Sequence, residues 1–175
     1  MSAAGVLGID AGQVRAAVSA VPDPELPTVT IGMLGMVERV DLTREGDVTV
    51  ELLPTFTGCP ATDYIVVDVR AAAMAVPGVR SVDVRLRLSP AWTADRITPE
   101  GREALRGFGI APPQTERLPL LGIAGRSDPM CPYCGSADTQ VTNAFGPTPC
   151  RALHQCNACH NPFEGFKALG GCAAR

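Results

Sequence analysis

The stretch Val48-Thr-Val-Glu-Leu-Leu-Pro-Thr-Phe-Thr-Gly-Cys-Pro60 determines how the N-terminal part of the chain is organised. Its first half alternates apolar and polar residues, and this period of two is typical of a half-buried strand. Pro54 to Gly58 then predict a loop, and Pro60 suits the beginning of a helix that we expect to extend to about Val76. The stretch therefore predicts a strand, a loop and a helix in succession.

Similar elements flank this stretch on both sides. Asp10 and Gln13 form a capping box that predicts a helix, and the prolines between Pro22 and Pro27 end that helix in a rigid loop. The expected strands cover residues 37–42, 48–53 and 82–88, and the expected last helix covers 98–108. The order α-β-β-α-β-α over residues 10–110 predicts a small α/β sandwich, in which helices pack on a sheet.

Residues 129–169 form a second module, which the proline-containing residues 111–128 join to the first as an expected linker. Five of the seven cysteines lie in this module, including the pairs Cys131/Cys134 and Cys156/Cys159. Two such C-x2-C knuckles place four thiolates around one metal ion, and this donor set suits zinc and iron alike. We therefore expect a rubredoxin-like zinc ribbon. Cys150 is either a small buried apolar residue or an auxiliary thiol for transient metal or cluster contact.

Cys59 is the second candidate site. The positive partial charge of a helix N-terminus stabilises a thiolate, so we expect the pKa of this thiol to be lowered. Thr55 and Thr57 place two hydroxyls just before it. Asp23 and Glu25 lie on the proline-stiffened loop, where they either bind a cation or face solvent in an ordinary turn. The alternative for Cys59 is an inert capping cysteine.

Composition excludes several classes of function. The net charge of −3 argues against a general affinity for nucleic acid. No apolar run is long enough to span a membrane, and the N-terminus lacks the pattern of a signal peptide, so we expect a cytoplasmic protein. The chain lacks the Glu-x-x-His pairs of a di-iron oxygenase and the G-x-G-x-x-G fingerprint of a dinucleotide-binding protein. We therefore expect that it is not itself an enzyme. Trp92 is expected to be a core or interface anchor.

Residues 13–110 resemble the iron–sulfur assembly domain of SufT-type proteins. The resemblance is carried by Asp23-Pro-Glu25, by Thr55-Phe-Thr-Gly-Cys-Pro60 and by Pro90-Ala-Trp-Thr-Ala-Asp-Arg-Ile-Thr-Pro99. With the cysteine-rich tail from Cys131 to Lys167, nearly the whole chain resembles the PaaD family, also called PaaJ, of phenylacetyl-CoA oxygenase subunits.

This resemblance implies a non-catalytic accessory subunit of the oxygenase that epoxidises the ring of phenylacetyl-CoA. Such a subunit would mature that complex by delivering iron or an iron–sulfur cluster, with Cys59 as the exchange ligand and Asp23 and Glu25 nearby. The partners implied are the other oxygenase subunits, the iron–sulfur assembly machinery and a second copy of the chain. The alternative is a rubredoxin-like electron carrier with iron in the four-cysteine site.

Overall fold

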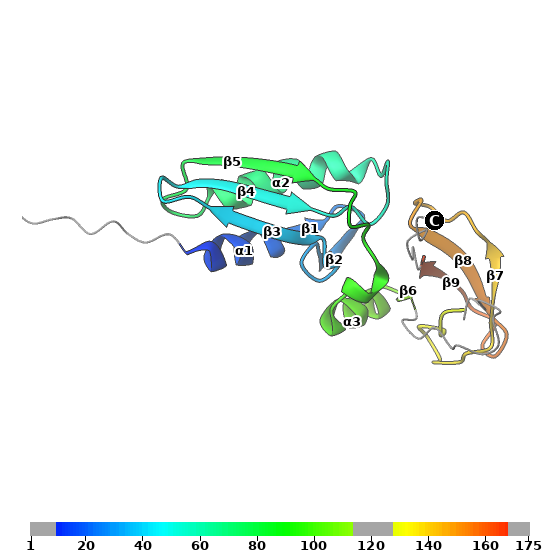
Figure 1. The fold of residues 1–175 in the computed structure, drawn as a ribbon. Coiled ribbons are helices and arrows are strands. Elements are labelled where there is room, and N and C mark those ends of the chain that lie inside the picture. Colours follow the sequence, from blue (N-terminus) through cyan, green and yellow to red (C-terminus); the bar gives the residue numbers. More distant parts are fainter. Residues whose placement is uncertain (1–9, 114–127, 168–175) are drawn as a thin grey trace, which may run out of the picture.

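The computed structural model describes residues 10–113 and 128–167. These residues form an α/β domain followed by a β-sheet module that contains the four-cysteine cluster, as the sequence predicts (Figure 1). Most of the expected linker, the last two residues of the expected ribbon module and Cys172 lie outside the described residues.

The central sheet of the α/β domain has the strand order β3-β4-β5. Strands β3 (Val37–Leu42) and β4 (Asp47–Leu52) form the predicted antiparallel hairpin. Strand β5 (Ser81–Leu86) pairs with β4 in parallel, so helix α2 (Ala61–Met74) is the crossover between two neighbouring strands. The loop that carries Cys59 therefore lies where the carboxyl end of β4 meets the beginning of α2.

Helices α1 (Ala11–Ser19) and α2 cover one face of this sheet (Figure 1). The Asp10 side chain caps α1 by accepting a hydrogen bond from the Gly12 N–H at 2.9 Å. Apolar side chains from both helices and from β4 fill the interior between the two layers, and the most completely buried of them include Val14, Val18, Val50, Leu52 and Val69. Phe56, in the loop before Cys59, packs against this core and anchors the loop.

The prediction of a rigid loop over residues 22–27 is only partly right, because part of this segment forms strands. Strands β1 (Pro22–Asp23) and β2 (Leu26–Thr30) pair antiparallel around this turn. The Ile31 N–H donates to the Val21 carbonyl at 2.9 Å, so the pairing continues outside the prolines. Proline has no backbone N–H to donate, so a proline-rich segment does not look like a strand in the sequence. The residues next to the prolines can still form the hydrogen bonds that pair two strands.

The segment after β5 connects the α/β domain to the ribbon. A 3₁₀ turn η1 (Ala94–Arg96) precedes helix α3 (Pro99–Gly107), which Thr98 caps by accepting from the Gly101 N–H at 3.0 Å. Trp92 is buried, and its indole N–H donates to the Leu34 carbonyl at 2.7 Å. This confirms the prediction of an anchor at this position.

The ribbon sheet has the strand order β6-β9-β8-β7. Strands β7 (Thr139–Asn143), β8 (Arg151–Cys156) and β9 (Pro162–Phe166) are antiparallel neighbours. Strand β6 (Ile110–Ala111) directly follows α3 and pairs in parallel with β9. The α/β domain thus contributes one strand to the edge of the ribbon sheet. Within residues 10–113 and 128–167, every helix is too short or too polar to cross a bilayer.

Candidate metal centre

Four cysteines of the ribbon converge on one point. The Sγ atoms of Cys131 and Cys159 are 3.7 Å apart, those of Cys134 and Cys156 are 3.6 Å apart, and all four lie within 4.8 Å of one another. A tetrahedral ion with metal–sulfur bonds of about 2.3 Å separates its sulfur ligands by about 3.8 Å. The four side chains therefore fit one tetrahedral ion, as the two knuckles predict.

The two knuckles share the same backbone hydrogen bond and the same left-handed turn. The Gly135 N–H donates to the Cys131 carbonyl, and the His160 N–H donates to the Cys156 carbonyl, both at 2.9 Å. Gly135 has φ +74° and His160 has φ +60°, so each closes its turn in the left-handed region. His160 thus holds the backbone position that glycine holds in the first knuckle, and this turn explains its place beside the ligands.

Backbone and side-chain donors surround the ribbon sulfurs. The Cys159 N–H donates to the Cys156 sulfur, and the Asn161 side-chain amide donates to the Cys159 sulfur, both at 3.5 Å. The backbone N–H of Asn161 and its side-chain amide lower the pKa of Cys159 to about 6. A thiolate is the form that binds a metal, so these donors favour the ligating form. No pattern in the sequence indicates this role for Asn161.

Cys59 lies in the loop before α2 and is half-buried. Its N–H donates to the Phe56 carbonyl at 3.4 Å, and its carbonyl accepts from the Thr62 N–H at 3.1 Å. Thr55 is half-buried and Thr57 is exposed. In the part of the chain that the structure describes, neither hydroxyl forms a hydrogen bond with the Cys59 thiol.

The prediction that the pKa of Cys59 is lowered is wrong. Burial raises the pKa of this thiol, and the backbone N–H of Ala61 at the helix N-terminus lowers it by less than burial raises it. Electrostatic interactions with Cys150, Asp23 and Glu25 raise the pKa of Cys59 further. These three residues are distant from Cys59 in the sequence. The sequence next to Cys59 therefore does not indicate that they raise its pKa.

The structure brings Asp23 and Glu25 together with the ribbon. Asp23 accepts a hydrogen bond from the Glu25 N–H at 2.8 Å, so the two acidic residues share one tight turn. Burial raises the pKa of Asp23, and the nearby Arg151 lowers it. Arg151 itself is buried and pairs with Glu164 at 2.7 Å and with Glu25 at 3.8 Å. Sequence reasoning misses Arg151 because its role depends on contacts between two modules.

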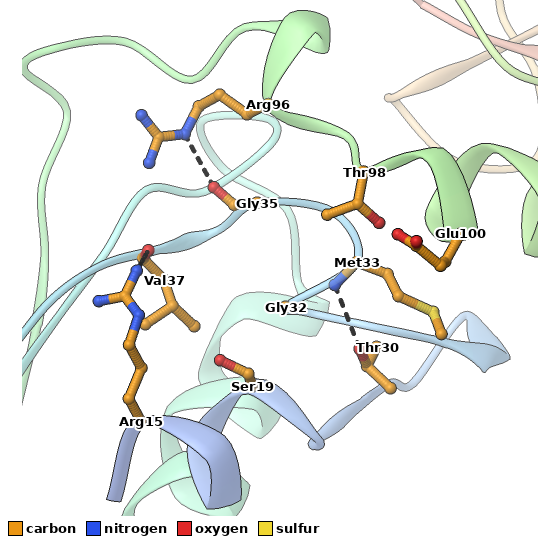
Figure 2. Close-up of a pocket in the computed structure, with 10 residues that line it drawn as sticks. All are labelled: Arg15, Ser19, Thr30, Gly32, Met33, Gly35, Val37, Arg96, Thr98 and Glu100. Atoms are coloured by element: carbon orange, nitrogen blue, oxygen red, sulfur yellow. Dashed lines mark hydrogen bonds between the residues drawn. The ribbon is translucent and has the colours of Figure 1, made fainter. Parts of the chain in front are cut away.

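A hollow in the α/β domain lies away from these residues. It has a volume of about 590 Å³ and is bounded by α1, by the turn after β2 and by the start of α3 (Figure 2). Arg15 donates to the Val37 carbonyl at 3.0 Å, and Arg96 donates to the Gly35 carbonyl at 2.8 Å. Because the chain itself occupies both guanidinium groups and no predicted site residue lines the hollow, we assign it no role.

Comparisons with known proteins match the two modules separately. Residues 12–85 match the family described as iron-sulfur cluster assembly protein, and residues 122–167 match the PaaD zinc beta ribbon domain. A domain of unknown function from Bacillus anthracis has a solved structure that aligns with a TM-score of 0.51 and 32% identity, over 54% of this chain and 89% of that one. An iron–sulfur assembly domain joined to a cysteine ribbon defines the class of protein.

A relative that aligns over nearly its whole length identifies the family, and a second relative matches the N-terminal domain. A protein of Escherichia coli K12, named as a 1,2-phenylacetyl-CoA epoxidase subunit, is 41% identical over 164 residues, which cover 90% of this chain and 92% of that protein. A Porphyromonas gingivalis protein named as an Fe-S protein maturation auxiliary factor is 40% identical over 78 residues, which cover 45% of this chain and 73% of that protein. The chain belongs to the PaaD family of phenylacetyl-CoA epoxidase subunits.

Proposed function

We propose that this chain matures the phenylacetyl-CoA epoxidase complex by delivering iron or an iron–sulfur cluster to it, and that it performs no chemistry on the substrate. Cys59 is the transfer ligand, and Asp23, Glu25, Thr55 and Thr57 form its surroundings. The other epoxidase subunits are its clients, the iron–sulfur assembly machinery supplies the cargo, and a second copy of the chain can share a cluster.

The observation that carries this proposal is the environment of Cys59. The half-buried thiol interacts electrostatically with Asp23 and Glu25, and Arg151 forms an ion pair with Glu25. A thiol and carboxylates of this kind bind a cation through few protein ligands, which favours exchange over permanent retention. The name of the Porphyromonas gingivalis relative supports the same role for the domain that carries Cys59.

We infer that the ribbon holds zinc and serves a structural role. Its four thiolates complete the coordination of one ion and leave no open position for a substrate. The match to a zinc ribbon family supports zinc as the metal. Iron in this site would instead make the protein an electron carrier, and the exposure of Cys134 supplies the solvent-facing edge that such a carrier needs.

Co-expression of the epoxidase subunits with the Cys59→Ser variant tests the transfer role. We expect the variant to keep its fold and ribbon metal, while the purified epoxidase loses most of its iron and activity. Cys172→Ser is the matched control, because it also removes one thiol and should leave the iron content unchanged. An epoxidase with full iron content beside Cys59→Ser would refute the proposal.

A further inference from the structure

Strand β5 lies at an open edge of the central sheet. Within residues 10–113 and 128–167 it pairs with β4 alone, and Figure 1 shows it along the outer side of the sheet. The opposite edge is partly covered, because the Arg15 side chain of α1 donates to the Val37 carbonyl of β3 at 3.0 Å. An uncovered edge presents backbone donors and acceptors that can bind another strand. Strand β5 is therefore the edge of this sheet that can accept a partner.

The hydrogen bonds to β4 determine which backbone groups of β5 point outward. The N–H of Arg87, directly after β5, donates to the Leu52 carbonyl at 2.8 Å. In a parallel pair, the residues that bond to the neighbouring strand recur at every second position. The N–H and carbonyl groups of Val82, Val84 and Leu86 therefore point away from β4. They form a row of groups along the whole edge.

The side chains of β5 are complementary to themselves in one register. In antiparallel pairing with a second copy centred on Val84, Val82 lies opposite Leu86 of the copy. Asp83 then lies opposite Arg85 of the copy, and this opposite-charge pair occurs twice. Pairing centred on Asp83 or Arg85 instead places two like charges opposite each other. Opposite charges across a strand pair stabilise it and like charges destabilise it, so charge selects the register centred on Val84.

The two faces of β5 suit this pairing. Val82 and Val84 pack against the core, whereas Asp83 and Arg85 pair with each other at 2.7 Å and are both more than half exposed. In the paired state, each charged side chain meets an opposite charge without leaving solvent. An exposed pair of this kind costs little to rearrange, because surface ion pairs contribute little to stability.

Exposed apolar side chains lie along the same edge. Leu86 near the end of β5 is exposed, and so are Tyr64 and Val67 of α2, the helix that packs on β5. Pairing of two β5 strands brings the two copies of α2 side by side on one face of the joint sheet. The pairing would therefore remove part of this apolar surface from water.

We propose that two copies of this chain pair antiparallel through β5, with Val84 on the two-fold axis, and form one continuous sheet. The interface is isologous, because both copies use the same strand. The Cys59 loops follow the carboxyl end of β4, which is parallel to β5, so they lie at opposite ends of the joint sheet. This dimer holds two separate transfer sites, and sharing of one cluster would need a different contact. The inference goes beyond the proposed function and does not rest on it.

Charge reversal at the interface tests this pairing in the full chain. Sedimentation equilibrium should show a monomer–dimer equilibrium for the unaltered chain. Asp83→Arg and Arg85→Asp each place like charges opposite each other at two symmetric positions, so we expect about tenfold weaker dimerisation of either variant. An equimolar mixture of the two variants should recover dimers, because the arginines of one variant then face the aspartates of the other.

The matched controls are Arg39→Asp and Asp41→Arg. Arg39 and Asp41 form an exposed pair of the same kind on β3, away from the proposed interface, and these variants make the same changes of charge. Both should dimerise as the unaltered chain does. A chain that stays monomeric up to about 1 mM would overturn the proposal. So would interface variants that dimerise normally, or a mixture that associates no better than its components. None of these results bears on the transfer role, which the iron content of the epoxidase tests separately.

Discussion

Aliphatic side chains fill the interior of the α/β domain, whereas the small core of the ribbon consists of Ala111, Cys131, Cys156 and Phe163. Half of that small core therefore belongs to metal ligands. The first region is stabilised by burial of apolar surface, and we expect the second to depend on a bound ion. We therefore expect the two regions to respond differently to removal of the metal, although Cys150 and Phe166 of the ribbon also pack in the α/β core.

Removal of a buried cysteine ligand of the ribbon should have the largest effect on folding. In Cys156→Ser we expect loss of the metal and unfolding of residues 128–167, because zinc binding supplies roughly 10 kcal/mol or more in modules of this kind. The α/β domain should remain folded. Hydrogen exchange of the two regions measures this, with His160→Gly as a control that suits the left-handed turn and should retain the metal. Equal protection of the ribbon in Cys156→Ser and the unaltered chain would contradict the comparison.

A cavity in the α/β core should destabilise the α/β domain and leave the ribbon metal in place. Leu52 is fully buried in the central strand, and Leu52→Ala should lower the free energy of unfolding by about 2–5 kcal/mol. The ribbon should keep its metal in the native state of this variant. Chemical denaturation together with zinc analysis measures both quantities. A variant of unchanged stability that has lost its zinc would reverse the assigned roles of the two regions.

The secondary structure near each motif could be predicted from the sequence. The hairpin of β3 and β4, helix α2 and the four ribbon ligands follow from periodicity and spacing over short distances. The pairing of β6 with β9 and the contact of Arg151 with Glu25 could not be predicted, because they join residues that are far apart in the sequence. The raised pKa of Cys59 has the same origin, since burial and distant charges outweigh the local helix N-terminus.

The junction between the α/β domain and the ribbon, where the ring of Trp92 lies against that of Phe166, offers a way to test how strongly the two regions are coupled. Trp92→Phe leaves the buried Leu34 carbonyl without its donor, and this should cost roughly 1–3 kcal/mol. Phe166→Leu is the companion variant, because it weakens the ring contact but keeps the hydrogen bond. We expect both variants to increase hydrogen exchange in β6 and β9. If exchange increases in the α/β domain alone, the junction does not couple the two regions.

The smallest change in stability is expected at Asp47, the first residue of β4. Arg80 and Ser81 lower the pKa of Asp47 by hydrogen bonding to its carboxylate. A folded pKa below the unfolded value stabilises the protein above the ordinary pKa of 3.8, and this contribution is lost as the pH falls through the folded value. Asp47→Asn should therefore be slightly less stable than the unaltered chain at neutral pH, and the difference should disappear in acid. Thermal unfolding at both pH values measures this, and a difference that persists in acid would exclude the ionised carboxylate as its cause.

Metal analysis with visible spectroscopy on anaerobically purified protein tests the central claim most directly. We expect one tightly held zinc per chain, together with iron that a mild chelator removes and that Cys59→Ser fails to bind. One iron per chain with a rubredoxin-type spectrum, unchanged in Cys59→Ser, would contradict this claim. That result would make the ribbon an electron-transfer centre and leave Cys59 without a role.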